Sequence, residues 1–153
     1  MTDAALERTF RAIGEAAPDG ADDWWVIGSA ALVLAGVEGV EPDDVDLIGA
    51  RATILRFLAC WGVAEGEPDP HGLFNSSPYL RVEAEGRVPI ETMGDLHFFR
   101  GGSWMPLIPR SRIGIDVAGT RLFIPALAEQ RDIFRLFGRP KDMEKARLVE
   151  AYL

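Results

Sequence analysis

Two aspartates separated by one residue, Asp44 and Asp46, open the segment "DVDLIGA". The alternation of this segment predicts a strand on which both carboxylates share one face. Two like charges held close together repel each other, and such a pair persists where a cation lies between them. Clustered carboxylate oxygens suit Mg²⁺ or Mn²⁺. The pair therefore predicts a divalent metal site.

A Gly-Ser step precedes the aspartates, because Gly28 and Ser29 follow the apolar stretch "WWVI" and open the segment "AALVLAGV". This pattern predicts a short buried strand, a break, and a short buried helix with Ser29 at its N-cap. Glycine lets the backbone approach a ligand, and the free N–H groups at a helix start favour an anion. A phosphate cradle beside a metal is what phosphoryl or nucleotidyl transfer requires.

A third carboxylate would complete a two-metal site. Glu91, in "RVPIETM", could point into the site or face solvent. Asp116, in "IGIDVAG", is the second candidate, although a turn position suits it as well. Simpler interpretations also stay open, with the Asp-x-Asp pair as surface acids and the Gly-Ser step as an ordinary helix start.

The elements that must position these residues follow from periodicity. Residues 3–17 and 51–61 predict amphipathic helices. The segments "YLRVEAEGRVPIETM" and "IGIDVAGTRLFIP" predict two antiparallel hairpins, and "RGGSWMP" predicts a loop that could act as a lid. Two helices are expected at the end of the chain, divided at Gly138 and Pro140. The last helix is expected to be lined by four apolar residues: Met143, Ala146, Val149 and Leu153.

The bulk properties narrow the class of protein. A chain of 153 residues predicts one α/β domain, residues 1–153, with a mixed sheet. A net charge of -8 argues against a broad nucleic-acid interface. Cys60 cannot form an intrachain disulfide and is expected in the core. No apolar run approaches the roughly 18 residues of a membrane span, so a cytoplasmic protein is expected.

The motif "VIGSAALVLAGV" followed by "PDDVDLI" resembles the nucleotidyltransferase fold superfamily, the DNA polymerase β-like group. It most resembles small bacterial members related to AbiEii-type toxins and to antibiotic nucleotidyltransferases. The ending "FGRPKDMEKARLVEAYL" is similar to that of AbiEii-like proteins. The resemblance implies a single-domain nucleotidyltransferase fold, in which a mixed β-sheet is flanked by helices.

The resemblance also implies roles for individual residues. Asp44, Asp46 and Glu91 would hold Mg²⁺ or Mn²⁺, with Glu91 as a ligand or as the base that activates the acceptor. Three further residues would hold the phosphates of the donor nucleoside triphosphate (NTP): Gly28, Ser29 and Lys141.

The implied reaction transfers a nucleoside monophosphate from an NTP to a hydroxyl of a small molecule or a protein. The sequence departs from the pattern of the superfamily in two places. "VEPD" stands where Arg or Thr is common before Asp-x-Asp, and the third acid is Glu where Asp is commoner. An inactive binding protein of the same fold, such as a toxin–antitoxin component or a homodimer subunit, therefore stays open as an alternative.

Overall fold

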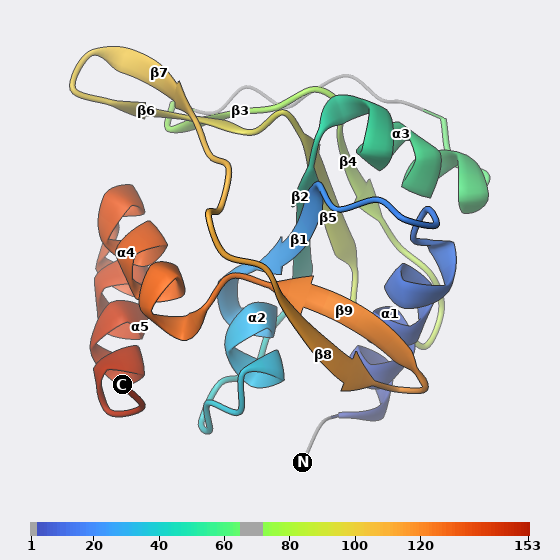
Figure 1. The fold of residues 1–153 in the computed structure, drawn as a ribbon, viewed down its shortest axis with the longest axis horizontal. Coiled ribbons are helices and arrows are strands. Elements are labelled where there is room, and N and C mark those ends of the chain that lie inside the picture. The colour runs from blue at the N-terminus through green and yellow to red at the C-terminus, as the bar shows by residue number, and fades with distance from the viewer. Residues whose placement is uncertain (1–2, 65–71) are drawn as a thin grey trace.

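The structure is a computed structural model that describes residues 3–64 and 72–153. The helices in these ranges are α1 (Ala4–Ala16), α2 (Gly28–Leu34), α3 (Arg51–Cys60), α4 (Leu127–Phe137) and α5 (Pro140–Glu150). The strands are β1 (Trp24–Ile27), β2 (Val45–Gly49), β3 (Phe74–Asn75), β4 (Tyr79–Val82), β5 (Ile90–Gly94), β6 (His97–Arg100), β7 (Ser103–Pro106), β8 (Ile113–Val117) and β9 (Thr120–Ile124). Figure 1 shows the central strands between α1 and α3 on one side and the paired α4 and α5 on the other.

The central sheet has four strands in the order β1-β2-β5-β4, with β2 and β5 parallel and the two outer pairs antiparallel. Its register places four residues in one row across the sheet, which we call the central row: Ile27, Asp46, Glu91 and Arg81. Side chains at directly paired positions project to the same face of a sheet. The central row therefore presents an acid on each parallel strand and a cation on the edge strand beside them.

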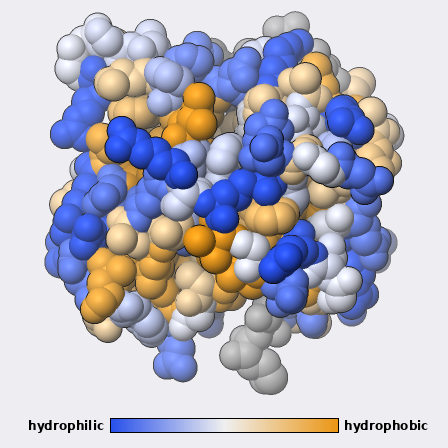
Figure 2. Space-filling view, viewed as in Figure 1, coloured by the Kyte–Doolittle hydropathy of each residue, from blue (hydrophilic) through white to orange (hydrophobic). Residues whose placement is uncertain are grey.

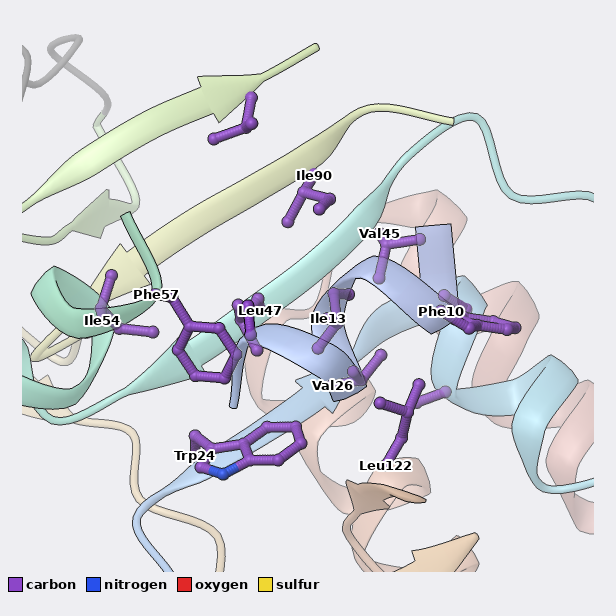
Figure 3. Packing of buried hydrophobic residues seen from close by; sticks show 14 of the residues in the cluster. Phe10, Ile13, Trp24, Val26, Val45, Leu47, Ile54, Phe57, Ile90 and Leu122 are labelled. Carbon is purple, nitrogen blue, oxygen red and sulfur yellow. The ribbon is translucent and has the colours of Figure 1, made fainter. Parts of the chain in front are cut away.

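The main core lies on the opposite face of the sheet. Val45 and Leu47 point to this face because side chains alternate along β2. Phe10 of α1 and Phe57 of α3 pack against them, and Trp24 contacts Phe57 edge to face with 5.3 Å between ring centroids. Figure 3 shows these side chains meeting between the sheet and the helices. Each such side chain contributes about 1.5–3 kcal/mol when fully buried, so this layer holds β2 in place.

A second apolar cluster covers part of the other face. Trp25, Ile27 and Ile48 contribute from β1 and β2, and Phe98 and Ile133 pack on them from β6 and α4. At the start of β2, the side chains of Asp44 and Asp46 point to this same face, and both are only partly buried. Polar groups thus meet the apolar layer at the point where the parallel strands begin.

The C-terminal helices form a pair that packs against α2. Gly138 ends α4 in the left-handed region, at φ 69°, and its N–H donates to the Phe134 carbonyl at 3.0 Å. Pro140 then starts α5 at a position where no intrahelical N–H is needed. Phe134 and Ala146 bury against Leu32 of α2. The pair is thereby held next to the Gly-Ser step that begins α2.

The connection from β7 to β8 is tied to α4 by one carboxylate. Glu129 accepts hydrogen bonds from the backbone N–H groups of Arg110, at 2.7 Å, and of Ser111, at 2.9 Å. The Ser111 hydroxyl also donates to it. Burial alone would raise the pKa of Glu129, but these hydrogen bonds outweigh burial and lower the pKa.

Most of the predicted elements are confirmed. The α+β class, the mixed sheet, the hairpins β4–β5 and β8–β9, and the helix break at Gly138 are all present. No helix in the described ranges is long and apolar enough to cross a membrane. Hydrophilic residues cover much of the face seen in Figure 2, with apolar areas between them, including over α4 and α5.

The prediction of a loop at "RGGSWMP" is wrong, because this segment is a hairpin of β6 and β7. Arg100 pairs with Ser103, which leaves Gly101 and Gly102 as a two-residue turn with φ of 60° and 80°. Two consecutive positive φ angles are what a tight hairpin turn requires, and glycine provides them without strain. Trp104 lies on this hairpin against Phe99, with 5.2 Å between ring centroids.

Three placements of single residues are also wrong. The N-cap of α2 is Ile27, not Ser29, because Gly28 turns the chain one residue earlier with φ +73°. Cys60 is exposed rather than in the core, since it ends α3 on the side turned away from the sheet. Leu153 lies beyond the end of α5 and is 56% exposed.

Candidate functional site

Three carboxylates converge at the start of the parallel strands. One oxygen each from Asp44, Asp46 and Glu91 can be chosen so that all three lie within 4.8 Å of one another. Asp44 immediately precedes β2, Asp46 is the second residue of β2, and Glu91 is the second residue of β5. The side chain of Glu91 is 24% exposed and that of Asp44 is 34% exposed, so solvent reaches the cluster.

The sheet register explains why these acids meet. Asp46 and Glu91 are direct partners in the parallel β2–β5 pair, and the period of two puts Asp44 on the same face as Asp46. The alternative third acid, Asp116, lies on β8 and pairs instead with Arg121 at 3.4 Å. Glu91 is therefore the acid that the fold brings to the aspartate pair.

The backbone at Gly28 comes very close to the cluster. A Cβ at this position would lie 2.7 Å from the Oδ2 atom of Asp46, closer than real side-chain contacts allow. Two features favour glycine at this position: the short distance to Asp46 and a φ of +73°, which residues with a side chain rarely adopt. Ser29 follows in the first turn of α2 and is partly buried. The Gly-Ser step and the acids thus form one continuous site.

The electrostatics of Asp46 are strongly perturbed. Burial is the largest cause, and the neighbouring charges of Asp44 and Glu91 add to it; together they raise the pKa of Asp46 to about 7. Lys145 and Lys141 oppose this shift and lower the pKa. The carboxyl group of Asp46 therefore holds its proton more tightly than an ordinary aspartate does.

The two lysines identify α5 as the positive side of the site. Lys141 is exposed and Lys145 is partly buried, and they stand four residues apart, so they share one face of α5. The Nζ atom of Lys145 also lies 5.7 Å from the Phe134 ring centroid. Both lysines are close enough to Asp46 to act on its pKa, and they are the cations of α5 that do so.

An arginine sits directly on the carboxylates. The Nη1 atom of Arg81 donates to Glu91 Oε1 at 2.9 Å and reaches Asp44 Oδ2 at 3.4 Å. Its Nε donates to Glu83 Oε1 at 3.2 Å. The hydrogen bond to Glu83 contributes most to raising the pKa of Arg81, with those to Asp44 and Glu91 adding to it. One guanidinium therefore contacts two of the three acids.

Sequence reasoning missed Arg81 and Lys145. The segment that contains Arg81 predicted only a strand, because the pairing of Arg81 with Glu91 needs the register of β4 on β5. Lys145 could have been suspected from its i, i+4 spacing with Lys141. Of the two histidines, His97 makes a 2.7 Å hydrogen bond with the Asp95 carbonyl, and His71 lies outside the described residues.

The residues present fit a hard divalent cation. All three candidate ligands are carboxylates, which Mg²⁺ and Mn²⁺ prefer. Burial is the largest cause of the raised pKa of Asp46, and a cation beside it would offset the repulsion from Asp44 and Glu91 that adds to this shift. The cluster also leaves room for further ligands, because its side chains are partly exposed.

Comparison with known proteins shows a similarity to a solved structure. No protein-family profile and no curated protein matches the chain. Among solved structures, the crystal structure of a "putative nucleotidyltransferase" from Thermotoga maritima is similar, with a TM-score of 0.73 and 19% sequence identity. The match covers 92% of this chain and 89% of that chain. At this identity the likeness is one of fold, and the chain therefore has the nucleotidyltransferase fold.

Proposed function

We propose that this protein transfers a nucleoside monophosphate from an NTP to an acceptor hydroxyl in a reaction that depends on Mg²⁺ or Mn²⁺. The observation that carries the proposal is the convergence of one oxygen each from Asp44, Asp46 and Glu91 within 4.8 Å, with the backbone of Gly28 close to Asp46. The nucleotidyltransferase fold supports it independently. Both features are expected of an enzyme that handles a metal–triphosphate complex.

The donor would bind on the side of the site formed by α2 and α5. The backbone can approach the phosphates closely at Gly28, and Ser29 offers a hydroxyl and a first-turn N–H. Lys141 and Lys145 would offset the charge of the β- and γ-phosphates as the pyrophosphate leaves. Bound divalent ions would neutralise phosphate charge and lower the pKa of the acceptor hydroxyl.

The bond changes follow from this arrangement. The acceptor oxygen attacks the α-phosphorus, the bond from the α-phosphorus to the oxygen bridging to the β-phosphate breaks, and pyrophosphate departs. The proton of the acceptor hydroxyl passes to Glu91 or to solvent. Glu91 lies on the side away from α2, next to β4. The acceptor would therefore bind on the β5–β4 side, opposite the phosphates.

The proposed experiment tests Glu91 directly. We expect Glu91→Gln to keep most of the thermal stabilisation by Mg·NTP, since Asp44 and Asp46 remain. We expect it to slow transfer of label from α-labelled NTPs to components of cell extract by about a hundredfold or more. Glu85→Gln, in the exposed turn between β4 and β5, is the matched control. Undiminished transfer by Glu91→Gln would refute its assigned role.

A non-catalytic binding protein of the same fold is the second candidate. The observation that favours it is the contact of Arg81 with Glu91 and Asp44, because an internal cation already offsets part of the acidic charge. Clear binding of Mg·NTP by the wild type without any label transfer would support this candidate. The relationship to AbiEii-type proteins, a toxin–antitoxin partner and a homodimer remain predictions for either function.

A further inference from the structure

Arg81 holds the position that a cation would take between two of the proposed ligands. Its Nη1 atom lies 2.9 Å from Glu91 and 3.4 Å from Asp44, both within ion-pair distance. The ion pairs of Arg81 at the cluster are with Asp44 and Glu91, and Asp46, the third acid, is not among them. The guanidinium thus satisfies one side of the cluster and leaves the other side free.

The backbone fixes this arrangement. Arg81 is the direct partner of Glu91 in the antiparallel β4–β5 pair, so its side chain starts on the same face and next to the acid. A guanidinium stays charged at every physiological pH, so protonation cannot remove it. A divalent ion close to Glu91 would then repel the guanidinium strongly, because both are cations at short range.

Glu83 offers Arg81 a second position. It lies two residues further along the chain, directly after the end of β4, and already accepts a hydrogen bond from the Nε atom at 3.2 Å. The side chain of Glu83 is 69% exposed and that of Arg81 is 41% exposed, so the guanidinium can rotate into solvent and keep this partner. Displacement therefore breaks the contacts with Glu91 and Asp44 without leaving a buried charge.

We propose that Arg81 is an internal competitor for the metal: it occupies the place of a cation between Asp44 and Glu91, and full metal occupancy requires it to swing toward Glu83. A first ion can bind at Asp46 with Arg81 in place. The ion that uses Glu91 must displace the guanidinium. Metal affinity at that position is consequently lower than the three carboxylates alone would give. The inference rests on the proposed metal site, and its test separates the two.

The test is a Mn²⁺ titration of the metal-free protein, in which electron paramagnetic resonance measures free Mn²⁺. We expect Arg81→Met to raise the affinity of the weaker Mn²⁺ by about tenfold, on the scale of one charge-assisted hydrogen bond. Arg121→Met is the matched control, because it removes an arginine from the exposed ion pair with Asp116. We expect the control to change Mn²⁺ affinity by less than about twofold.

The Glu91→Gln background distinguishes competition from a general effect of charge. If Arg81 competes through Glu91, the gain from Arg81→Met disappears in the double variant. A gain that persists there, or a gain no larger than that of Arg121→Met, overturns the inference. Wild-type Mn²⁺ binding that depends on Asp46 would in that case leave the proposed function standing. Absence of Mn²⁺ binding in the wild type and in every variant would overturn both.

A thermal melt without metal gives a second, independent measurement. Removing Arg81 leaves three acids without their nearest cation, so we expect Arg81→Met to lower the metal-free melting temperature more than Arg121→Met does. Added Mn²⁺ should then stabilise Arg81→Met more than it stabilises the wild type. Equal stabilisation of both would contradict competition.

Discussion

The substitution Asp46→Asn should stabilise the metal-free protein at neutral pH. In the folded state the pKa of Asp46 is raised from 3.8 to about 7, mainly by burial and then by Asp44 and Glu91. The folded state therefore binds this proton more tightly than the unfolded state does. The stability linked to the proton is fully present below about pH 4 and is lost as the pH rises through about 7. Asparagine carries no charge and avoids this loss.

The magnitude follows from the size of the shift. A shift of about three units corresponds to roughly 4 kcal/mol at full ionisation. The side chain of Asp46 is partly exposed, and solvent screens its charge, so we expect about 1–2 kcal/mol. For a chain of this length that corresponds to a rise in melting temperature of roughly 2–8 °C at pH 8.

The assay is thermal or urea unfolding in the presence of a chelator, from pH 4 to pH 8. Asp46→Asn and the wild type should converge at the acid end and separate as the pH rises. Asp43→Asn, an exposed neighbour of the cluster, is the control with the same change in net charge. Parallel pH profiles for Asp46→Asn and the wild type would refute the argument, because Asp46 would then titrate alike in both states.

Three further substitutions test the surroundings of the site. Gly28→Ala should lower the free energy of unfolding in urea by about 1–3 kcal/mol and weaken Mn²⁺ binding, because the new Cβ would meet Asp46. The control is Gly20→Ala, at a position with a similar φ of +74° and open space around it, which should affect stability alone. Lys145→Met should reduce thermal stabilisation by Mg·NTP while leaving stabilisation by Mg²⁺ alone unchanged or larger. Equal stabilisation of the variant and the wild type by Mg·NTP would exclude Lys145 from phosphate binding. Glu129→Gln should lower the free energy of unfolding by about 1 kcal/mol at pH 7, and its difference from the wild type should shrink as the pH falls through the lowered pKa of Glu129. A difference in stability that does not depend on pH would contradict the hydrogen-bond explanation.

Local patterns were sufficient to predict most of the elements and the aspartate pair of the site. The alternation in "DVDLIGA" predicts that Asp44 and Asp46 share a face, since the period of a strand requires only neighbouring residues. The hairpins could be predicted for the same reason. Glu91 could not be placed, because its approach to Asp46 depends on a parallel pairing between strands 45 residues apart in sequence. Arg81 was missed for the same reason, one strand further out.

The errors have local causes as well. The prediction for "RGGSWMP" relied on Pro106 and on the absence of a helical pattern, whereas the Gly-Gly pair is itself a signal for a tight hairpin turn. The helix start was placed at Ser29 because serine is a common N-cap. The close approach to Asp46 instead places the turn at Gly28, and this tertiary contact outweighs the capping preference.

The central row also bears on how such a site withstands divergence of sequence. The distance between the backbone positions of Asp46 and Glu91 is set by the spacing of hydrogen-bonded strands, about 4.8 Å. This spacing is a property of the backbone and does not depend on the surrounding side chains. Substitutions in the core can therefore accumulate without moving the two acids apart, provided that the strand register survives. Selection on the distance between the acids would then act chiefly through the register of β2 on β5.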